Sequence, residues 1–445
     1  MRVVHERSAG LDVHKKTVVG CRARPGAAGE MERETRSFGT MTPDLLQLVD
    51  WLNEWECTHV AMESTGDYWK PVFNLLEGHM EVMLVNAQHV KYVPGRKTDI
   101  SDAEWLTDLL QHGLLKASFI PPAPQRDLRD LTRYRSSLVQ ERAREVNRVQ
   151  KLLEGANIKL ASVATDVLGV SGRAMLEELV SGSKEASEMA QLARGRMRNK
   201  IPELVKALTG IVRSHHRLLL AQQLAHIDFL DQQIATISEA IERQIESMSE
   251  DTSGHSDGDA DSESAETVED AAPKQNAPLP PQLAIALLDT IPGVDQRVAE
   301  IIVAELGTDM ARFPTAQHAA AWAGVAPGNY ESAGKRYSGR TRKGDRALRT
   351  GLIQAAWAAS RTKNTYLSTQ YHRLAGRRGK KRACVALAHS ILVIAYHMLS
   401  RHEAYRELGG NYFDEQKKES VINRLTRRIE KLGYSVKLEP QAAAA

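Results

Sequence analysis

The first ninety residues alternate between short apolar segments and one amphipathic segment. The short apolar segments have the pattern of strands and lie at residues 8–22, 58–63 and 81–87. Between the first two, TPDLLQLVDWLNEW has the apolar spacing of a helix, with Thr42 as its expected cap and Pro43 in its first turn. Strands that alternate with helices indicate an α/β layer domain.

The pattern changes to long helical periods in the middle of the chain. From Gln125 to about Leu160 the sequence is charged and helical, and a second long helix is expected over residues 214–248. Apolar residues of this second helix follow alternating three- and four-residue steps, as in a coiled coil: Ile227, Leu230, Ile234, Ile237, Ile241 and Met248. Residues 161–213 between the two helices are expected to be helical and irregular.

Beyond residue 280, PPQLAIALLDTIPGVDQRVAEIIVAELG contains two apolar helices joined by the turn IPGV. This pattern is typical of a helix-hairpin-helix, whose backbone N–H groups near Gly293 can bind a DNA phosphate together with the positive end of the second helix. The alternative is an ordinary αα-hairpin. A basic loop, two more apolar helices and a polar helical tail from Asp414 follow.

Length and composition are those of a soluble globular protein with about two or three cores. The chain has 445 residues, of which 42% are hydrophobic and 26% charged. We expect neither a signal peptide nor a membrane span. Cys21, Cys57 and Cys384 lack CxxC spacing and are expected to be free thiols in a reducing compartment. These features predict a cytoplasmic protein.

The formal net charge of +3 conceals a basic body. Residues 249–272 carry nine acidic side chains and no Lys or Arg. Without these nine, 59 basic residues face 47 acidic ones, which leaves a net charge of +12. A basic body can bind nucleic acid by displacing counterions from phosphates. The acidic segment is rich in Ser, Gly and Asp and is predicted to be a disordered linker.

Four carboxylates occupy positions where a nuclease could bind divalent cations. Asp12 lies in a predicted strand, Glu63 ends another, and Asp99 and Asp102 open a predicted helix in KTDISDAEWL. Four converging negative charges persist only where a cation neutralises them. Their hard oxygen ligands suit Mg²⁺ or Mn²⁺, and a pair of such ions stabilises the attacking and leaving oxygens of phosphoryl transfer.

Each carboxylate also has an ordinary structural explanation. A single Asp after a strand is often a turn residue, Asp99 could be a helix N-cap, and Ser101 with Glu104 could form a capping box. A nucleotide site like that of the sugar-kinase and actin-like ATPases is disfavoured, because His14 replaces the glycine that would let the backbone approach a phosphate. No Walker-type motif occurs in the sequence.

A serine lies in a basic loop of the second half of the chain. Small residues beside Ser332, in residues 329–335, would let a phosphodiester come close. Positive charge for phosphate oxygens comes from Lys335, Arg336, Arg340, Arg342, Lys343, Arg346 and Arg349. The Ser332 hydroxyl could act as a nucleophile and form a phosphoserine intermediate. The alternative is a phosphate-binding loop in which the serine only donates a hydrogen bond.

Both halves of the chain resemble the DEDD-type transposases of insertion sequences, a family that includes the Piv invertase. The motifs that carry the resemblance occur in the family's order: GLDVHK, MESTG-YW, KTD-x-x-DA, IPG, FP-x-A-x-x-x-A-x-AG-x-xP and S-x-G…GR…KG-x-R-x-LR. They cover residues 8 to about 155 and 283 to about 402. By this resemblance the four carboxylates are the family's acidic tetrad, and Ser332 is its nucleophilic serine.

The resemblance implies a DNA transposase that acts as a serine recombinase. The serine would attack a DNA phosphodiester and hold the broken strand covalently, while the tetrad and its Mg²⁺ assist from the other domain. From their charge, Lys335, Arg336 and Arg340 are expected to be phosphate clamps. The resemblance further implies element-end and target DNA as partners, guidance by a bridge-type non-coding RNA, and a homo-oligomer built as a dimer of dimers.

Two features of the chain differ from the family pattern. Ala333 replaces the first of two glycines that often follow the serine, and the acidic linker is unusually long. Ser338 is the second candidate nucleophile.

The resemblance also implies the fold class and the order of domains. We expect a RuvC-like (RNase H-like) α/β domain, a helical coiled-coil middle and a mainly α C-terminal domain with a helix-hairpin-helix. The boundaries are 1–122 for the RuvC-like DEDD domain, 123–248 for the coiled-coil and helical region, 249–277 for the acidic linker, 278–410 for the transposase domain with its serine loop, and 411–445 for the polar helical tail.

Two other functions fit the same residues. A RuvC-like junction nuclease would use water as its nucleophile, so it would leave free 5′-phosphate ends and no protein–DNA adduct. A nucleic-acid-binding scaffold with an inactive centre would keep its DNA binding after loss of Asp12 or of the metal ion.

Overall fold

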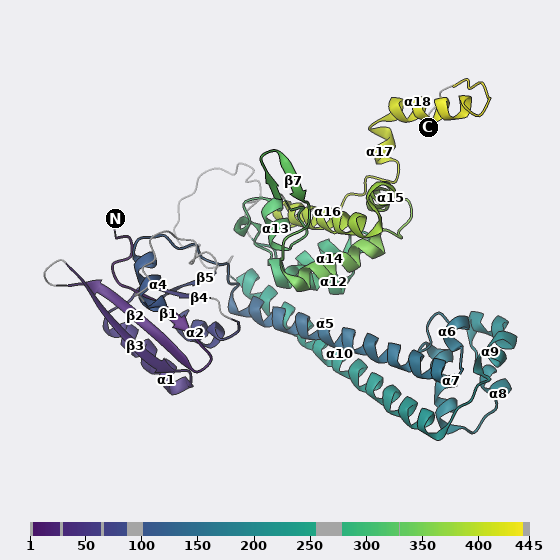
Figure 1. The fold of residues 1–445 in the computed structure, drawn as a ribbon, viewed down its shortest axis with the longest axis horizontal. Helices are drawn as coiled ribbons and strands as arrows, with labels where there is room; N and C mark the ends of the chain where they lie inside the picture. Colours follow the sequence, from purple (N-terminus) through teal and green to yellow (C-terminus); the bar gives the residue numbers. More distant parts are fainter. Residues whose placement is uncertain are drawn as a thin grey trace, which may run out of the picture. The chain divides into compact units, whose positions relative to one another are not determined.

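The computed structural model describes residues 3–26, 30–63, 66–86, 101–254, 278–328 and 330–438. The chain forms two compact units, Met1–Pro121 and Pro122–Ala445 (Figure 1). The first unit contains a sheet covered by helices, and the second is almost entirely helical.

A five-stranded sheet in the order β3-β2-β1-β4-β5 forms the centre of the first unit. Its strands are β1 (Ser8–Val13), β2 (Thr17–Pro25), β3 (Met31–Gly39), β4 (His59–Glu63) and β5 (Glu81–Val85). The first three strands are antiparallel neighbours, whereas β4 runs parallel to both β1 and β5. The predicted α/β layer domain is therefore confirmed.

Two details of the predicted strands are wrong. Residues 8–22 form a hairpin of two strands, because the polar residues 14–16 make a turn in which the His14 N–H donates to the Thr17 carbonyl at 2.9 Å. Strand β3 has no counterpart in the prediction. It lies at the edge of the sheet and buries only Phe38, so its sequence carries too few apolar residues to indicate a strand.

Helices cover the two faces of this sheet. Helices α1 (Thr42–Glu54) and α2 (Trp69–Leu76) pack on the face that carries Leu11 and Val13. The predicted helix is thus confirmed as α1, although Met41 is its N-cap instead of the expected Thr42. Helix α4 (Asp102–Gln111) covers the opposite face, since successive residues of a strand point to opposite sides and Gly10 contacts α4.

Helix α4 lies directly on the backbone of β1 at Gly10. A Cβ atom at this position would lie 2.4 Å from the Ala103 carbonyl oxygen and 2.6 Å from the Thr107 nitrogen. The Thr107 hydroxyl also donates to the Cys21 carbonyl of β2 at 2.9 Å. Only glycine allows a helix to come this close to a strand.

The direction of α4 follows from its contacts with residues before and within β1. Val4, which precedes β1, donates its N–H to the carbonyl of Gln111, the last residue of α4, at 2.7 Å. Further along the chain, Gly10 contacts Ala103 in the first turn of α4. The N-terminus of α4 therefore lies at the edge of the sheet where β1 and β4 end.

Two long helices, α5 (Ala123–Gly155) and α10 (Ser214–Gly254), lie side by side in the second unit (Figure 1). Leu138 of α5 packs with Leu230 and Ile234 of α10. Both predicted long helices are confirmed, and their coiled-coil geometry stays a prediction. Between them, a helical region with its own core contains α6 (Leu160–Val163), α7 (Val170–Ser181), α8 (Ala186–Ala190), a 3₁₀ helix (Gly195–Lys200) and α9 (Ile201–Leu208).

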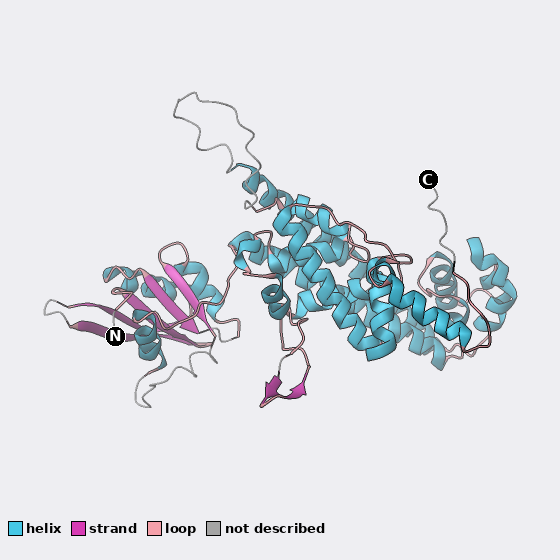
Figure 2. Ribbon diagram, turned by 90° about the horizontal axis from the view of Figure 1, so that it is seen from above, coloured by secondary structure: helices cyan, strands magenta, loops and turns pink. Residues whose placement is uncertain are grey.

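The C-terminal body of the second unit is a bundle of helices around an apolar core that includes Ile302, Leu352 and Leu387. Its helices are α11 (Pro281–Asp289), α12 (Gln296–Leu306), a 3₁₀ helix (Met310–Arg312), α13 (Ala316–Trp322), α14 (Arg346–Ala359), α15 (Tyr366–Arg378) and α16 (Lys380–Arg401), followed by α17 (Tyr412–Glu415) and α18 (Lys418–Glu430). A small hairpin of β6 (Tyr330–Ser332) and β7 (Lys335–Ser338) projects from these helices (Figure 2).

Helix α16 is long and apolar enough to cross a membrane by length and composition, with a mean hydropathy of 1.7 in its most apolar window. It is the one such helix among the described residues, and half of that window is buried inside the protein. Leu387, Ile391 and Ala395 of α16 belong to the apolar core of the body. Core helices of globular proteins have the same composition.

Replacing Gly10 with Ala should force α4 away from β1 and lower the free energy of unfolding of the first unit by about 2 kcal/mol, the usual cost of overpacking. Urea unfolding followed by tryptophan fluorescence measures this change. Gly78→Ala is the matched control, because a Cβ atom there meets nothing within 4 Å. Equal stability of the two variants would contradict the close packing of α4 on Gly10.

Candidate functional site

Asp12 and Glu63 lie side by side at the ends of two parallel strands. The register pairs Leu11 with Met62, so the next residues along the two strands are neighbours whose side chains lie on the same face. This is the face covered by α4, because Gly10, two residues before Asp12, contacts that helix. Neighbouring strands are about 4.8 Å apart, so the two carboxylates are close enough to bind one ligand.

His14 contacts Asp12 across the β1–β2 turn. Its Nε2 atom lies 3.1 Å from Oδ2 of Asp12, and the two side chains are 58% and 21% exposed. The Asp12 carboxylate is thus held by its neighbour and still reached by solvent, as a ligand for an incoming cation must be.

Asp102 is the first residue of α4, at the same edge of the sheet. The N-cap of this helix is Ser101, whose hydroxyl accepts a hydrogen bond from the Glu104 N–H at 3.3 Å. The Glu104 carboxylate in turn accepts from the Ser101 N–H at 3.3 Å. The capping box is therefore present, and capping does not account for Asp102. Asp99 lies outside the described residues.

The sheet edge therefore combines two carboxylates on strand ends with one at a helix N-terminus. Their oxygens are donors of the kind that Mg²⁺ and Mn²⁺ prefer, and the partial positive charge of a helix N-terminus stabilises an acidic side chain there. Within residues 3–26, 30–63, 66–86 and 101–121, no three His, Cys, Asp or Glu side chains lie close enough to hold one ion. Metal binding by these carboxylates stays a prediction.

Ser332 lies at the tip of the β6–β7 hairpin. It is the last residue of β6 and pairs with Lys335, the first residue of β7. The two residues between them, Ala333 and Gly334, have φ angles of 50° and 72°. Two positive φ angles in a two-residue turn are typical of a type I′ hairpin, which presents its flanking residues on a narrow projecting ribbon.

The predicted phosphate-binding residues follow Ser332 along the descending side of this hairpin. Lys335, Arg340, Arg342, Lys343 and Arg346 are exposed to solvent. Arg336 lies in β7, with its backbone in register with Glu331. The structure therefore places the positive charges on one segment that leads from the tip of the hairpin to α14.

Gly293 lies in the turn between α11 and α12 and packs against α14. Its φ angle is 88°, and a Cβ atom would lie 2.4 Å from the Ala359 nitrogen. The N-terminus of α12 is capped by the Asp295 carboxylate, which accepts from the Val298 N–H at 2.9 Å. Close helix packing thus explains this glycine, and contact with a DNA phosphate stays a prediction.

Two buried glutamates in α12 are absent from the predicted site. Glu300 and Glu305 lie in the apolar helix QRVAEIIVAEL and are almost inaccessible to solvent. Glu300 accepts a hydrogen bond from Arg135 of α5 at 2.5 Å. The sequence did contain a signal for them: both are acidic residues at helix positions that the apolar pattern predicts to be buried. A buried charge requires a partner.

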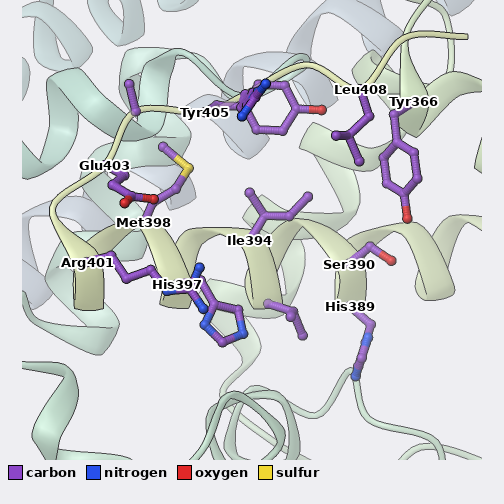
Figure 3. Close-up of a pocket in the computed structure, with 13 residues that line it drawn as sticks. Tyr366, His389, Ser390, Ile394, His397, Met398, Arg401, Glu403, Tyr405 and Leu408 are labelled. Atoms are coloured by element: carbon purple, nitrogen blue, oxygen red, sulfur yellow. The ribbon is translucent and has the colours of Figure 1, made fainter. Parts of the chain in front are cut away.

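A separate pocket of about 420 Å³ lies between α16 and the loop that follows it (Figure 3). It is lined by His389 and His397 of α16 and by Tyr405 of the loop. Burial lowers the pKa of His389 and raises the pKa of Tyr405. None of the residues predicted for metal binding or strand cleavage lines this pocket.

Two segments of the chain match the models of known families. Residues 9–158 match the model of a DEDD family of IS110-type proteins whose description is transposase, and residues 285–372 match the transposase IS116/IS110/IS902 family. The chain is 25% identical over 354 residues to the transposase for insertion sequence element IS1111A of Coxiella burnetii, covering 78% of this chain and 79% of that protein. It is 23% identical over 372 residues to the putative transposase y4pF/y4sB of Sinorhizobium fredii, covering 82% and 78%.

Replacing Ala333 with Gly should stabilise the hairpin, because an alanine at positive φ is strained by about 1 kcal/mol. A change of this size lowers the population of the open hairpin about fivefold, which limited trypsin digestion at Lys335 would detect as slower cleavage. Gly334→Ala is the opposite control, since it adds strain at a position where a Cβ atom meets nothing within 4 Å. Faster digestion of Ala333→Gly than of the wild type would contradict the turn geometry.

Proposed function

The chain carries the two domains of an IS110-family insertion-sequence transposase, and from this premise we propose that it exchanges DNA strands through a covalent phosphoserine intermediate. The observation that carries the proposal is the position of Ser332 at the tip of a projecting hairpin, beside Lys335 and a run of exposed arginines. A residue at the tip of a narrow ribbon can be brought close to a phosphodiester.

The strand exchange proceeds in two balanced steps. The Oγ atom of Ser332 attacks phosphorus, the bond from phosphorus to the leaving strand's oxygen breaks, and the serine proton passes to that oxygen or to solvent. The broken strand is then held as a phosphoserine ester. A hydroxyl at the end of another strand attacks the same phosphorus and releases Ser332, so no external energy source is needed.

Positive side chains would bind the charge that develops on the phosphate. Lys335 is opposite Ser332 in the hairpin, and Arg336 and Arg340 follow it. Arginine can bind two phosphate oxygens at once. Arg342, Lys343 and Arg346 extend the same positive segment toward α14 and would bind neighbouring phosphates.

The carboxylates of the first unit would hold a divalent cation, Mg²⁺ or Mn²⁺. Asp12, Glu63 and Asp102 lie at one sheet edge, and Asp99 would complete the set. A divalent cation supplies charge neutralisation at a phosphate when it is bound. His14 would keep the Asp12 carboxylate oriented toward that ion.

The partners follow from the basic body of the chain. Element-end and target DNA are the substrates, and a bridge-type non-coding RNA would select them by base pairing. A dimer of dimers would hold donor and target DNA together. We place this activity in the cytoplasm, where free thiols such as buried Cys21 stay reduced.

A junction nuclease is the second candidate function. It is favoured by the carboxylates alone, because the matched DEDD family segment of residues 9–158 contains Asp12, Glu63 and Asp102 but not Ser332. In that case water would attack the phosphodiester within the first unit, and the hairpin would only bind DNA.

A covalent adduct separates these two candidates. The wild-type protein is incubated with Mg²⁺, with labelled element-end DNA and with the non-coding RNA encoded beside its gene. We expect the labelled DNA to stay covalently attached to the protein on a denaturing gel. Ser332→Ala should abolish the adduct, whereas Ser338→Ala should retain it. Cleavage that survives Ser332→Ala and leaves free 5′-phosphate ends would replace strand exchange with hydrolysis.

Metal binding is tested on the first unit's carboxylates. Asp12→Asn and Glu63→Gln should each weaken Mn²⁺ binding at least about tenfold, because each removes a charged oxygen ligand. Electron paramagnetic resonance of free Mn²⁺ during a titration measures the affinity. Asp50→Asn, an exposed acid of α1, is the control and should bind as the wild type does. An equal loss of Mn²⁺ affinity in all three variants would mean that Mn²⁺ responds to the overall negative charge of the protein and not to a site at Asp12 and Glu63.

A further inference from the structure

Residues 324–344, here named the serine ribbon, leave and re-enter the body of the second unit at a root where the backbones of two glycines touch. A Cβ atom on Gly344 would lie 2.2 Å from the Gly324 nitrogen, and one on Gly324 would lie 2.7 Å from the Gly344 nitrogen. Immediately beyond them, the Asp345 N–H donates to the Trp322 carbonyl at 3.1 Å. The two ends of the ribbon thus touch at Gly324 and Gly344 without side chains between them, so a shift of the root would be passed on to the ribbon.

Asp345 has two functions at this root. Its Oδ1 atom accepts the Leu348 N–H at 2.7 Å and caps α14. Its Oδ2 atom accepts a hydrogen bond from Arg133 of α5 at 2.9 Å. One carboxylate therefore starts a helix and ties the root to another helix that is more than two hundred positions away in the sequence.

Arg133 binds a second, fully buried carboxylate with the same guanidinium group. Its Nε and Nη2 atoms donate to the two oxygens of Glu305 at 2.6 and 2.7 Å. Glu305 lies in α12 and is 0% exposed. Arg129, one turn earlier in α5, contributes a further contact to Glu305 at 3.2 Å. Arg133 thus joins α5, α12 and the root of the serine ribbon.

Such a cluster is better suited to fixing geometry than to adding stability. Burial raises the pKa of Glu305, and the hydrogen bonds from Arg133 oppose this rise. Replacing a buried ion pair with apolar residues is often neutral or stabilising, because desolvation offsets the Coulomb attraction. The planar arginine fork, in contrast, fixes the angle between the groups that it joins.

We propose that Arg133 is a positioning residue for Ser332: it fixes the root of the serine ribbon against α5 and α12, so that strand cleavage depends on a side chain that does not contact the reacting phosphate. This inference rests on the proposed role of Ser332 for its catalytic part. A shift of about 1 Å in a reacting group can cost about a hundredfold in rate, and a small rotation at the root is enlarged at the tip of the ribbon.

The chain offers variants that separate positioning from folding. Asp345→Asn removes the charge that pairs with Arg133 and keeps an oxygen that caps α14, since Asn is as good an N-cap as Asp. Arg133→Gln removes the other partner. Arg142→Gln is the matched control, because Arg142 lies on the same helix α5 and pairs with Asp231 of α10.

Hydrogen exchange of the root reports its rigidity without requiring DNA. The N–H groups of Gly324, Val325, Ala326 and Asp345 all donate to carbonyls of α13. Both Asp345→Asn and Arg133→Gln should speed their exchange about fivefold or more, the double variant should add little to either, and Arg142→Gln should have no effect. Unchanged exchange, or the same change in Arg142→Gln, overturns the proposal.

Cleavage assays then test whether root rigidity serves Ser332. Adduct formation should fall about tenfold or more in Asp345→Asn and Arg133→Gln, with DNA affinity within about twofold of wild type. Arg133→Lys keeps the positive charge but loses the planar guanidinium group. Its rate of adduct formation should lie between those of Arg133→Gln and the wild type. An equal loss of affinity and rate would make Arg133 a DNA ligand and overturn the positioning role. If wild type forms no adduct while root exchange responds as expected, the phosphoserine mechanism fails and the structural link from Arg133 to the ribbon stands.

Discussion

The close contact between helix α4 and strand β1 at Gly10 is the constraint on which the candidate metal site depends. Because a Cβ atom at Gly10 would overlap the backbone of α4, the helix can rest on the sheet only where the strand lacks a side chain. This contact fixes the distance of α4 from the sheet. The first residue of α4, Asp102, then lies at the edge where β1 and β4, the strands of Asp12 and Glu63, come to an end. The packing of α4 on Gly10 therefore decides where Asp102 lies relative to Asp12 and Glu63.

The second unit uses the same kind of constraint around its serine. The contact between Gly324 and Gly344 closes the root of the serine ribbon, and the turn at Ala333 and Gly334 closes its tip. At the root, the ion cluster of Arg133, Glu305 and Asp345 ties the ribbon to α5 and α12. Lys335, Arg342 and Lys343 of the ribbon are exposed to solvent.

The sequence predicts those parts of the fold whose pattern is long and local. Helices α5 and α10 extend over many turns, so their apolar spacing was sufficient, and Ser101 with Glu104 form a capping box that is visible within four residues. Strand β3 was missed because an edge strand with one buried side chain has almost no apolar pattern. The pairing of Arg133 with Asp345 could not be predicted, since it joins residues separated by 212 positions and depends on how three elements pack. Of the three residues in this cluster, Glu305 gave a signal in the sequence, as Glu300 did, because both are charged residues on the buried face of an apolar helix.

The most direct test of the account identifies the atom that carries DNA. Trapping wild-type protein on element-end DNA that contains a nick beside the cleavage site prevents rejoining, and digestion with trypsin and nuclease then leaves a peptide with a nucleotide attached. Fragmentation by mass spectrometry should place the nucleotide on Ser332, within the β6–β7 hairpin. A nucleotide on any other residue, or fully cleaved DNA with no modified peptide, would contradict the proposal that this hairpin carries the nucleophile.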